Sequence, residues 1–352
     1  MNEYAAMILA AVAAFGVTAL LGFVFIPWLH KLKFGQIILD IGPNWHKHKQ
    51  GTPTMGGLMF IAGVPLAVIA AFATDALMGG RMLSHDGDQS FTVKLIAGMI
   101  MALLFGVMGF LDDYMKVVKK RNKGLSIGQK TLMQLIISGG YLYSLWLSMD
   151  GRPYTLIPFL TDANGNSAAL FLGWFFWPFG IAVLYAATNA VNFTDGIDGL
   201  CSSVTMITGA GLAAFAVMRG MFGAGIVAAA LAGGCAGFLM WNRPKAKVFM
   251  GDTGSMFIGG LVVAVAFALD TPVILLLMGI IYVIEGLSDV IQIGYFKLTG
   301  GKRIFKMAPI HHHFEMSGWS EKKIDIVFSL VNIAGVAAGL VLVYFGLPGF
   351  LA

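Results

Sequence analysis

The chain has 352 residues, of which 58% are hydrophobic and only 12% are charged. Soluble domains carry about 25% charged residues, so this composition excludes an ordinary soluble protein and predicts a chain that is solvated partly by lipid. The formal net charge of +5 belongs to loops between long uncharged stretches such as residues 4–30. The orientation of a membrane protein accounts for positively charged loops, so the charge does not indicate nucleic-acid binding. We therefore expect no nucleic-acid partner.

Apolar segments recur along the whole chain. Crossing roughly 30 Å of hydrocarbon takes about 20 apolar residues, and lipid-exposed backbone must satisfy its own hydrogen bonds, so each segment predicts a helix. In chain order the ten segments cover residues 4–27, 54–74, 93–114, 131–149, 168–190, 199–218, 222–241, 254–269, 272–296 and 325–346. The ninth contains Glu285 and Asp289, so we expect it to face protein or water. The predicted fold is an all-α, polytopic membrane protein with one transmembrane domain over residues 1–352.

The basic residues predict the orientation. Nineteen of the 23 Lys and Arg residues lie in loops after the first, third, seventh and ninth segments. The other side carries only Arg81, Lys94, Arg152 and Arg219. Cytoplasmic loops of membrane proteins are enriched in Lys and Arg. We therefore expect the basic loops in the cytoplasm and both termini outside.

Other reactive side chains fall on the same predicted side. They are Asp112, Asp113, Asn192, Asp195, Asp198, Asn242, Asp252, His311, His312 and His313. The orientation was inferred from Lys and Arg alone, so this convergence is independent evidence for one cytoplasmic site.

Adjacent carboxylates end the third segment, in Phe110-Leu-Asp-Asp-Tyr114. Neighbours on a helix differ by about 100° in direction, so one of Asp112 and Asp113 could face a site while the other ties the helix to a loop. Placing a carboxylate within or near the hydrocarbon region of a membrane costs free energy, so such residues usually have a function. The alternative is an ordinary helix end with solvated acids.

The segment Asn189-Ala-Val-Asn-Phe-Thr-Asp-Gly-Ile-Asp-Gly199 places two Asn and two Asp between the fifth and sixth segments. Oxygen ligands at this spacing suit Mg²⁺ or a polar sugar. Asn, Asp and Gly also form turns, and a simple turn is the alternative.

The segment Phe249-Met-Gly-Asp-Thr-Gly-Ser255 places Asp252 at the start of a helix among small residues. The free N–H groups of a helix start favour phosphate, and an Asp there could hold the metal that bridges such a phosphate. The alternative is that Asp252 only caps the helix.

Three histidines follow one another in Pro309-Ile-His-His-His-Phe-Glu315. They could bind zinc, but the surrounding hard oxygens and lysines favour magnesium, so we expect the histidines to contact phosphate. The stretch His46-Lys-His-Lys49 would add cations, although topology and anionic lipid explain most loop lysines. No Walker A sequence is present, and phosphoryl transfer between a soluble nucleotide and a lipid fits best.

Together these motifs resemble the phospho-N-acetylmuramoyl-pentapeptide-transferase family, within the polyprenyl-phosphate N-acetylhexosamine-1-phosphate transferase superfamily. The segments that carry the resemblance are Gly51-Thr-Pro-Thr-Met-Gly-Gly57, Phe110-Leu-Asp-Asp-Tyr114, Asn189-Ala-Val-Asn-Phe-Thr-Asp-Gly-Ile-Asp-Gly-Leu200, Val248-Phe-Met-Gly-Asp-Thr-Gly-Ser255 and Ala308-Pro-Ile-His-His-His-Phe-Glu315. They occur in the family's order over nearly the whole chain. The aspartate motifs are shared across the superfamily, whereas the histidine segment and the Gly51–Gly57 turn are specific to this family.

The resemblance implies ten transmembrane helices, a homodimer in the bacterial inner membrane, and Mg²⁺ dependence. The implied substrates are UDP-N-acetylmuramoyl-pentapeptide and the membrane lipid undecaprenyl phosphate, and the products are lipid I and UMP. The residues it assigns to catalysis are Asp112, Asp113, Asp252 and His311, with Asp252 and Asn192 as metal ligands. The residues it assigns to substrate are Lys49, Thr54, Lys116, Lys130, Asn192, Asp195, Asp198, Asn242, Phe249, Gln292, His312 and His313.

Three other readings remain open at this point. A sister transferase that uses UDP-N-acetylglucosamine would share the aspartates but lack the histidine segment. A transporter or flippase would use Glu285 and Asp289 as a proton relay, although the polar residues cluster on one face rather than at the midplane. A purely structural membrane protein fits least, because so many reactive residues share one side.

Overall fold

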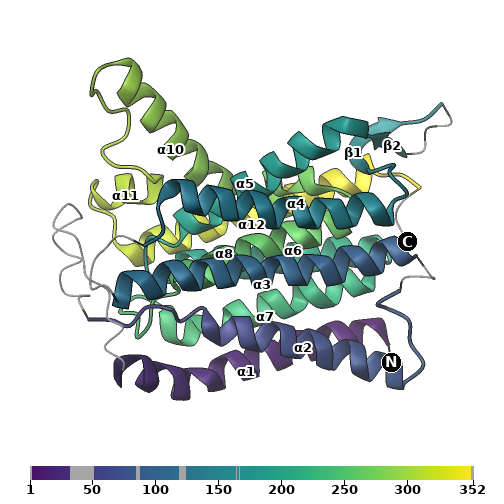
Figure 1. Cartoon of the computed structure of the whole chain (residues 1–352), viewed down its shortest axis with the longest axis horizontal. Coiled ribbons are helices and arrows are strands. Elements are labelled where there is room, and N and C mark those ends of the chain that lie inside the picture. The colour runs from purple at the N-terminus through teal and green to yellow at the C-terminus, as the bar shows by residue number, and fades with distance from the viewer. Residues whose placement is uncertain are drawn as a thin grey trace.

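Each apolar region expected from the sequence contains a helix in the computed structural model, which describes residues 2–31, 51–84, 88–118, 124–163, 165 and 167–349. The described residues form ten long helices, most of which run roughly along one direction (Figure 1). They are α1 (Glu3–Lys31), α2 (Leu58–Leu77), α3 (Gln89–Val118), α4 (Ile127–Ser148), α5 (Phe176–Thr194), α6 (Leu200–Met218), α7 (Phe222–Asn242), α8 (Gly251–Ala268), α10 (Ile280–Leu298) and α12 (Glu321–Gly346). Shorter elements are η3 (Gly173–Phe175), η4 (Pro272–Ile274), α9 (Leu275–Met278) and α11 (Ile310–Glu315).

Within the described residues, eight helices are long and apolar enough to cross a membrane, and the bent pair α9–α10 makes a ninth candidate. The chain is therefore a multi-pass membrane protein, as expected. Helix α4 is not among these nine, because Lys130 and several other polar residues interrupt its apolar sequence. The expected count of ten spans stays a prediction.

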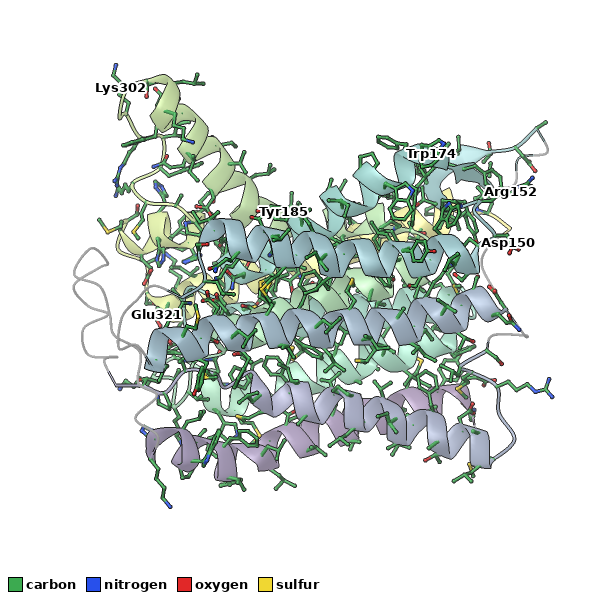
Figure 2. All side chains as sticks on the ribbon, in the orientation of Figure 1. Asp150, Arg152, Trp174, Tyr185, Lys302 and Glu321 are labelled. Carbon is green, nitrogen blue, oxygen red and sulfur yellow. The ribbon has the colours of Figure 1, made fainter. Side chains whose placement is uncertain are left out.

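The two ends of the bundle differ. We call the end that holds the last turn of α3 and the first turn of α8 the site end. Helix α1 begins and α12 ends at the opposite end, where Figure 1 marks N and C. Figure 2 places Lys302 and Glu321 toward the site end and Asp150 and Arg152 at the opposite end. Both termini thus share one side, as the basic loops predict, while the assignment of that side to the outside stays a prediction.

Helix α8 forms the centre of the bundle. Of its most apolar window, 89% is buried, compared with 28% for α1 and for α12. Helix α3 packs along one side of α8, and α5 packs on another. Close approach at the site end depends on Gly109, because a Cβ built there would overlap the backbone carbonyl of Asp252. The backbone contact between α3 and α8 positions the residues of the site.

The described chain is mostly helical, as expected, and also carries one two-stranded hairpin. Strands β1 (Tyr154–Thr161) and β2 (Ser167–Phe171) pair antiparallel, at the end opposite the site (Figure 1). The helical part of the segment expected over residues 168–190 therefore starts only at η3 and α5. The hairpin is anchored on the α8 side, since Leu156 N–H donates to Asp270 O at 2.7 Å. Residues 154–161 contain three β-branched and two aromatic residues, types that favour a strand over a helix.

The segment expected over residues 272–296 is broken rather than continuous. Helices α9 and α10 meet at an angle of 88°, and α10 leaves the bundle at the site end (Figure 1). The break frees the carbonyl of Met278, which accepts a hydrogen bond from the Thr208 hydroxyl at 2.9 Å. Asn332 on α12 in turn donates to the Thr208 oxygen at 3.0 Å. Side chains of two neighbouring helices thus satisfy the backbone where the span is interrupted.

Candidate active site

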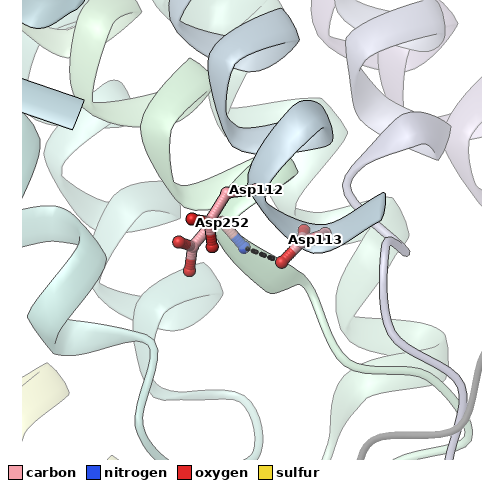
Figure 3. Close-up of side chains that lie close together, drawn as sticks. All are labelled: Asp112, Asp113 and Asp252. Atoms are coloured by element: carbon pink, nitrogen blue, oxygen red, sulfur yellow. Dashed lines mark hydrogen bonds between the residues drawn. The ribbon is translucent and has the colours of Figure 1, made fainter. Parts of the chain in front are cut away.

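Three carboxylates meet at the site end. Asp112 and Asp113 lie in the last turns of α3, and Asp252 is the second residue of α8 (Figure 3). One oxygen of each lies within 4.8 Å of the others. The expectation that these motifs converge is confirmed for these three residues. Like charges at this spacing repel, so the cluster needs compensating cations.

Two lysines supply those cations. Lys116 Nζ lies 2.6 Å from Asp112 and 3.4 Å from Asp252. Lys130 Nζ, from the first turn of α4, lies 2.5 Å from Asp252 and 3.2 Å from Asp112. The lysine side chains are 34% and 31% exposed, so neither side chain is fully enclosed by protein.

Asp113 has a different environment from Asp112. Its Oδ2 accepts hydrogen bonds from the N–H of Thr253 at 2.9 Å and from the Thr253 hydroxyl at 2.7 Å. Its Oδ1 accepts from Asp252 N–H at 3.3 Å, the bond drawn in Figure 3. Asp113 therefore satisfies free N–H groups at the start of α8, the work of a helix cap, although it belongs to another helix.

The donor set fits a hard divalent cation. With Asp113 bound to the start of α8, Asp112 and Asp252 are the carboxylates left to coordinate a metal. Asn192 on α5 lies beside them and donates to Asp252 Oδ1 at 3.2 Å and to Ser255 Oγ at 2.8 Å. Carboxylate and amide oxygens are the ligands that Mg²⁺ takes in proteins. Asn192 and Asp252, the metal pair expected from the sequence, are therefore neighbours.

The turn between α5 and α6, residues 195–199, adjoins the cluster. Burial, together with the nearby Asp252 and Asp113 carboxylates, raises the pKa of the Asp195 carboxyl well above its usual range. Asp198 instead accepts hydrogen bonds from the N–H groups of Lys245 at 3.1 Å and Ala246 at 3.0 Å. Asp195 thus lies near enough to the acidic cluster to be influenced by its charges. Asp198 instead connects the turn to the loop between α7 and α8.

Asn242 makes a similar link from the end of α7. It accepts from Gly199 N–H at 3.1 Å and donates to Val248 O at 2.9 Å. The loop then brings Phe249 beside the segment that precedes α2, since Phe249 N–H donates to Pro53 O at 2.8 Å. Thr54 lies in that segment, buried, with its hydroxyl near Gly251. The half-buried Phe249 ring is placed by this backbone pairing.

The histidines lie on the short helix α11. Buried His311 places Nδ1 3.0 Å from Glu285 on α10. His312 Nδ1 lies 2.6 Å from Glu315, and His313 Nδ1 accepts from Lys306 N–H at 3.1 Å. All three rings thus have protein partners of their own.

Gln292 on α10 holds the loop before α11. Its Oε1 accepts from the N–H groups of Ile304 and Phe305, both at 3.1 Å, and its Nε2 donates to Phe305 O at 3.0 Å. The side-chain amide therefore shapes the loop. Its expected contact with nucleotide stays a prediction.

Sequence reasoning missed several residues that build the site. Thr253 and Gly109 position Asp113 and Asp252, and Glu285 holds His311. A carboxylate inside an apolar helix was the available signal for Glu285. The segment was expected to face protein or water, and Glu285 faces protein, because its side chain is fully buried. Lys49 lies outside the described residues.

Comparisons with known proteins agree with this geometry. The family model for glycosyl transferase family 4 matches residues 95–270, and phospho-N-acetylmuramoyl-pentapeptide-transferase signature 1 matches residues 49–61. The first match contains the acidic cluster, both lysines and the 195–199 turn.

Three curated relatives are each described as phospho-N-acetylmuramoyl-pentapeptide-transferase. The Acetivibrio thermocellus protein is 44% identical over 323 residues, which cover 92% of this chain and 91% of the relative. The Clostridium perfringens SM101 protein is 45% identical, covering 93% and 94%. A Listeria monocytogenes serotype 4b protein is 43% identical, covering 91% and 93%. The similarity thus extends over nearly the full length of each protein.

Proposed function

Because the chain belongs to the phospho-N-acetylmuramoyl-pentapeptide-transferase family, we propose that the acidic cluster with its two lysines is the place where it performs that family's reaction. The enzyme transfers phospho-N-acetylmuramoyl-pentapeptide from its UDP-linked form to undecaprenyl phosphate. The observation that carries the placement is the meeting of Asp112, Asp252, Lys116 and Lys130 from the ends of three helices.

The transfer exchanges one phosphate linkage for another. An oxygen of the lipid phosphate forms a bond to the phosphorus attached to the sugar. The bond from that phosphorus to the bridging oxygen of the diphosphate breaks, and UMP leaves with the electron pair. Such chemistry consists mainly of positioning and charge neutralisation, which suits a site built from ammonium and carboxylate groups.

Lys116 and Lys130 are the residues to bind the phosphates. In the arrangement described, each ammonium neutralises acids, and each is partly exposed. We infer that on binding of the diphosphate both lysines turn toward its oxygens. Asp252 and Asn192, with Asp112 beside them, would then hold Mg²⁺, which when bound neutralises diphosphate charge and fixes its geometry. His311, His312 and His313 would bind the remaining polar groups of the substrate.

The remaining assignments rest on the resemblance and on the position of each residue. Asp195, Phe249 and Gln292 would form the nucleotide side of the site, with Phe249 stacked on uracil. Further substrate contacts are proposed for Lys49, Thr54, Asp198 and Asn242. We infer that the site end lies in the cytoplasm of a bacterial inner membrane, with residues 1–352 as one domain and a homodimer as the assembly.

Two routes use the same residues. The lipid phosphate attacks the sugar-bound phosphate directly, or an Asp carboxylate attacks first and forms a covalent phospho-enzyme. Rapid-quench trapping with labelled substrate distinguishes them, because only the second route leaves label on an aspartyl group.

UMP release by purified protein tests the function. UDP-N-acetylmuramoyl-pentapeptide with undecaprenyl phosphate and Mg²⁺ is expected to yield UMP and a lipid-linked product, while UDP-N-acetylglucosamine yields neither. Asp252→Asn is expected to abolish release, and so is chelation, reversed by added Mg²⁺. Equal turnover of the two sugar nucleotides would assign the chain to the sister transferases. Full activity of Asp252→Asn would place the reaction elsewhere.

A further inference from the structure

Glu285 on α10 and His311 on α11 form a buried pair. Both side chains are 0% exposed, and His311 Nδ1 lies 3.0 Å from Glu285 Oε2. The Nδ1–H tautomer of His311 would donate this hydrogen bond to the Glu285 carboxylate, which as an ion can only accept. In a neutral ring the other nitrogen, Nε2, is then a bare acceptor.

The Nε2 edge of the ring faces the turn between α5 and α6. A Cβ built on Gly196 would overlap His311 Nε2, so the ring fits there only because residue 196 is a glycine. Gly196 follows Asp195, whose carboxyl is close enough to feel the charges of Asp252 and Asp113. The free edge of the imidazole therefore points toward the surroundings of the acidic cluster and not toward lipid.

Among the described residues, no group hydrogen-bonds to His311 Nε2, although the atom is buried. A buried polar atom without a partner costs roughly 1–3 kcal/mol, so native proteins usually supply one. The partner expected for a bare Nε2 is a hydrogen-bond donor from substrate or water.

We propose that Glu285 is a positioning residue that holds His311 in the Nδ1–H form, so that Nε2 accepts a hydrogen bond from a hydroxyl or amide N–H of the sugar nucleotide. This role rests on the proposed function. It differs from that of Lys116 and Lys130, which supply positive charge. Gly196 provides the space that the orientation requires.

The protonation of His311 tests the proposal without activity. In the full-length protein with ¹⁵N-labelled histidines, the His311 signals are assigned by their loss in His311→Asn. Nδ1 is expected to carry the proton in the native protein. In Glu285→Gln the isosteric amide can donate to Nδ1, which moves the proton to Nε2. Asp150→Asn, which neutralises an exposed acid at the opposite end of the bundle (Figure 2), is the control and keeps the native pattern. Protonation of both nitrogens in the native protein, or the same pattern in Glu285→Gln, would overturn the proposal.

The rate of UMP release measures how the orientation of His311 affects catalysis. Glu285→Gln is expected to lower kcat/KM about 10–100-fold, by analogy with the loss found when the orienting partner of a metal-bound histidine is removed. In a His311→Asn background the same change is expected to add no further loss, because Glu285 acts through the imidazole. If Glu285→Gln lowered kcat/KM by the same factor in the native and the His311→Asn backgrounds, Glu285 would not act through His311. A native protein without any UMP release would instead refute the proposed function and leave the NMR result standing.

Gly196→Ala gives a second variant that leaves Glu285 intact. The added methyl group displaces the His311 ring, and a loss of kcat/KM comparable to that of Glu285→Gln is expected. Gly139→Ala is the control, since a Cβ there meets no heavy atom within 4 Å. Thermal unfolding of each variant separates loss of positioning from loss of fold. Native activity in a folded Gly196→Ala protein would contradict the proposal.

Discussion

Asp113 caps helix α8 through Thr253. One carboxylate oxygen accepts both the backbone N–H of Thr253, at 2.9 Å, and its hydroxyl, at 2.7 Å. The adjacent Asp112 lies closer to the lysines, 2.6 Å from Lys116 and 3.2 Å from Lys130, whereas Asp113 lies 3.7 Å from Lys116. Two neighbouring acids of one motif therefore have different roles, one in holding two helices together and one in the charged cluster.

Replacing each acid by its amide separates these roles. Asp113→Asn is expected to lower the free energy of unfolding by about 1–3 kcal/mol, because an amide nitrogen cannot accept the hydrogen bonds that the carboxylate accepts. Asp112→Asn is expected to abolish most UMP release with a smaller effect on unfolding. Thermal unfolding in detergent and UMP release are measured on both. Equal destabilisation by the two variants would show that Asp112 is also structural.

Lys130 is predicted to act on phosphate. Removal of its ammonium in Lys130→Gln is expected to reduce kcat/KM by about 100-fold or more, the size of effect seen when one preorganised charge-stabilising donor is lost. Lys302→Gln, an exposed lysine on the loop after α10 (Figure 2), is the matched control and should retain activity. A comparable loss in both variants would point to general surface charge rather than to a specific contact.

Gly109 is predicted to be essential for the spacing of α3 and α8. In Gly109→Ala the new methyl group collides with the Asp252 carbonyl, and overpacking of this kind costs about 1–3 kcal/mol. UMP release should fall as well, because Asp112 and Asp252 move apart. Gly16→Ala, where a Cβ has no heavy atom within 4 Å, should be neutral in both measurements.

The ion pair between Lys94 and Asp270 is predicted to be a stability element far from the chemistry. Its atoms lie 2.6 Å apart, with side chains only 1% and 4% exposed. Asp270→Asn leaves a buried ammonium without its charge partner and should destabilise the protein by about 3–5 kcal/mol. Asn tolerates the positive φ of 58° at this position, so backbone strain does not confound the comparison.

The double variant Lys94→Met with Asp270→Asn provides the control for this pair. It removes both charges, so its unfolding free energy should exceed that of Asp270→Asn alone. Folded protein of either variant should release UMP at the native rate at low temperature. Loss of UMP release without loss of stability would mean that the Lys94–Asp270 pair, at the opposite end of the bundle, affects the site.

Much of the site could be predicted from the sequence, since the apolar segments and the charge of the loops place its motifs at one end of the bundle. Asp112, Asp252, Lys116, Lys130 and Asn192 are indeed neighbours. The division of labour between Asp112 and Asp113 could not be predicted, because it depends on how α3 is rotated against α8. That rotation is a tertiary property and is set by contacts such as the one at Gly109.

The departures from the expected fold have the same origin. Residues 272–296 are apolar enough to predict one helix, yet Thr208 and Asn332, distant in sequence, satisfy the backbone at the break. The hairpin at 154–171 is not expected from the sequence, because four apolar residues assigned to the fifth span, 168–171, belong to β2. Composition distinguishes apolar from polar segments well, but it does not reveal which apolar residues are paired as strands.

Lys116 and Lys130 also decide how the protein can be handled. Two ammonium groups face three carboxylates, so the cluster is nearly balanced before any cation arrives. Domains that fold around a structural zinc ion lose their fold when a chelator removes it. Here the built-in cations should preserve the fold through exhaustive dialysis against chelator. One stored, metal-free preparation could then be divided and reconstituted with different divalent ions, each compared on identical protein.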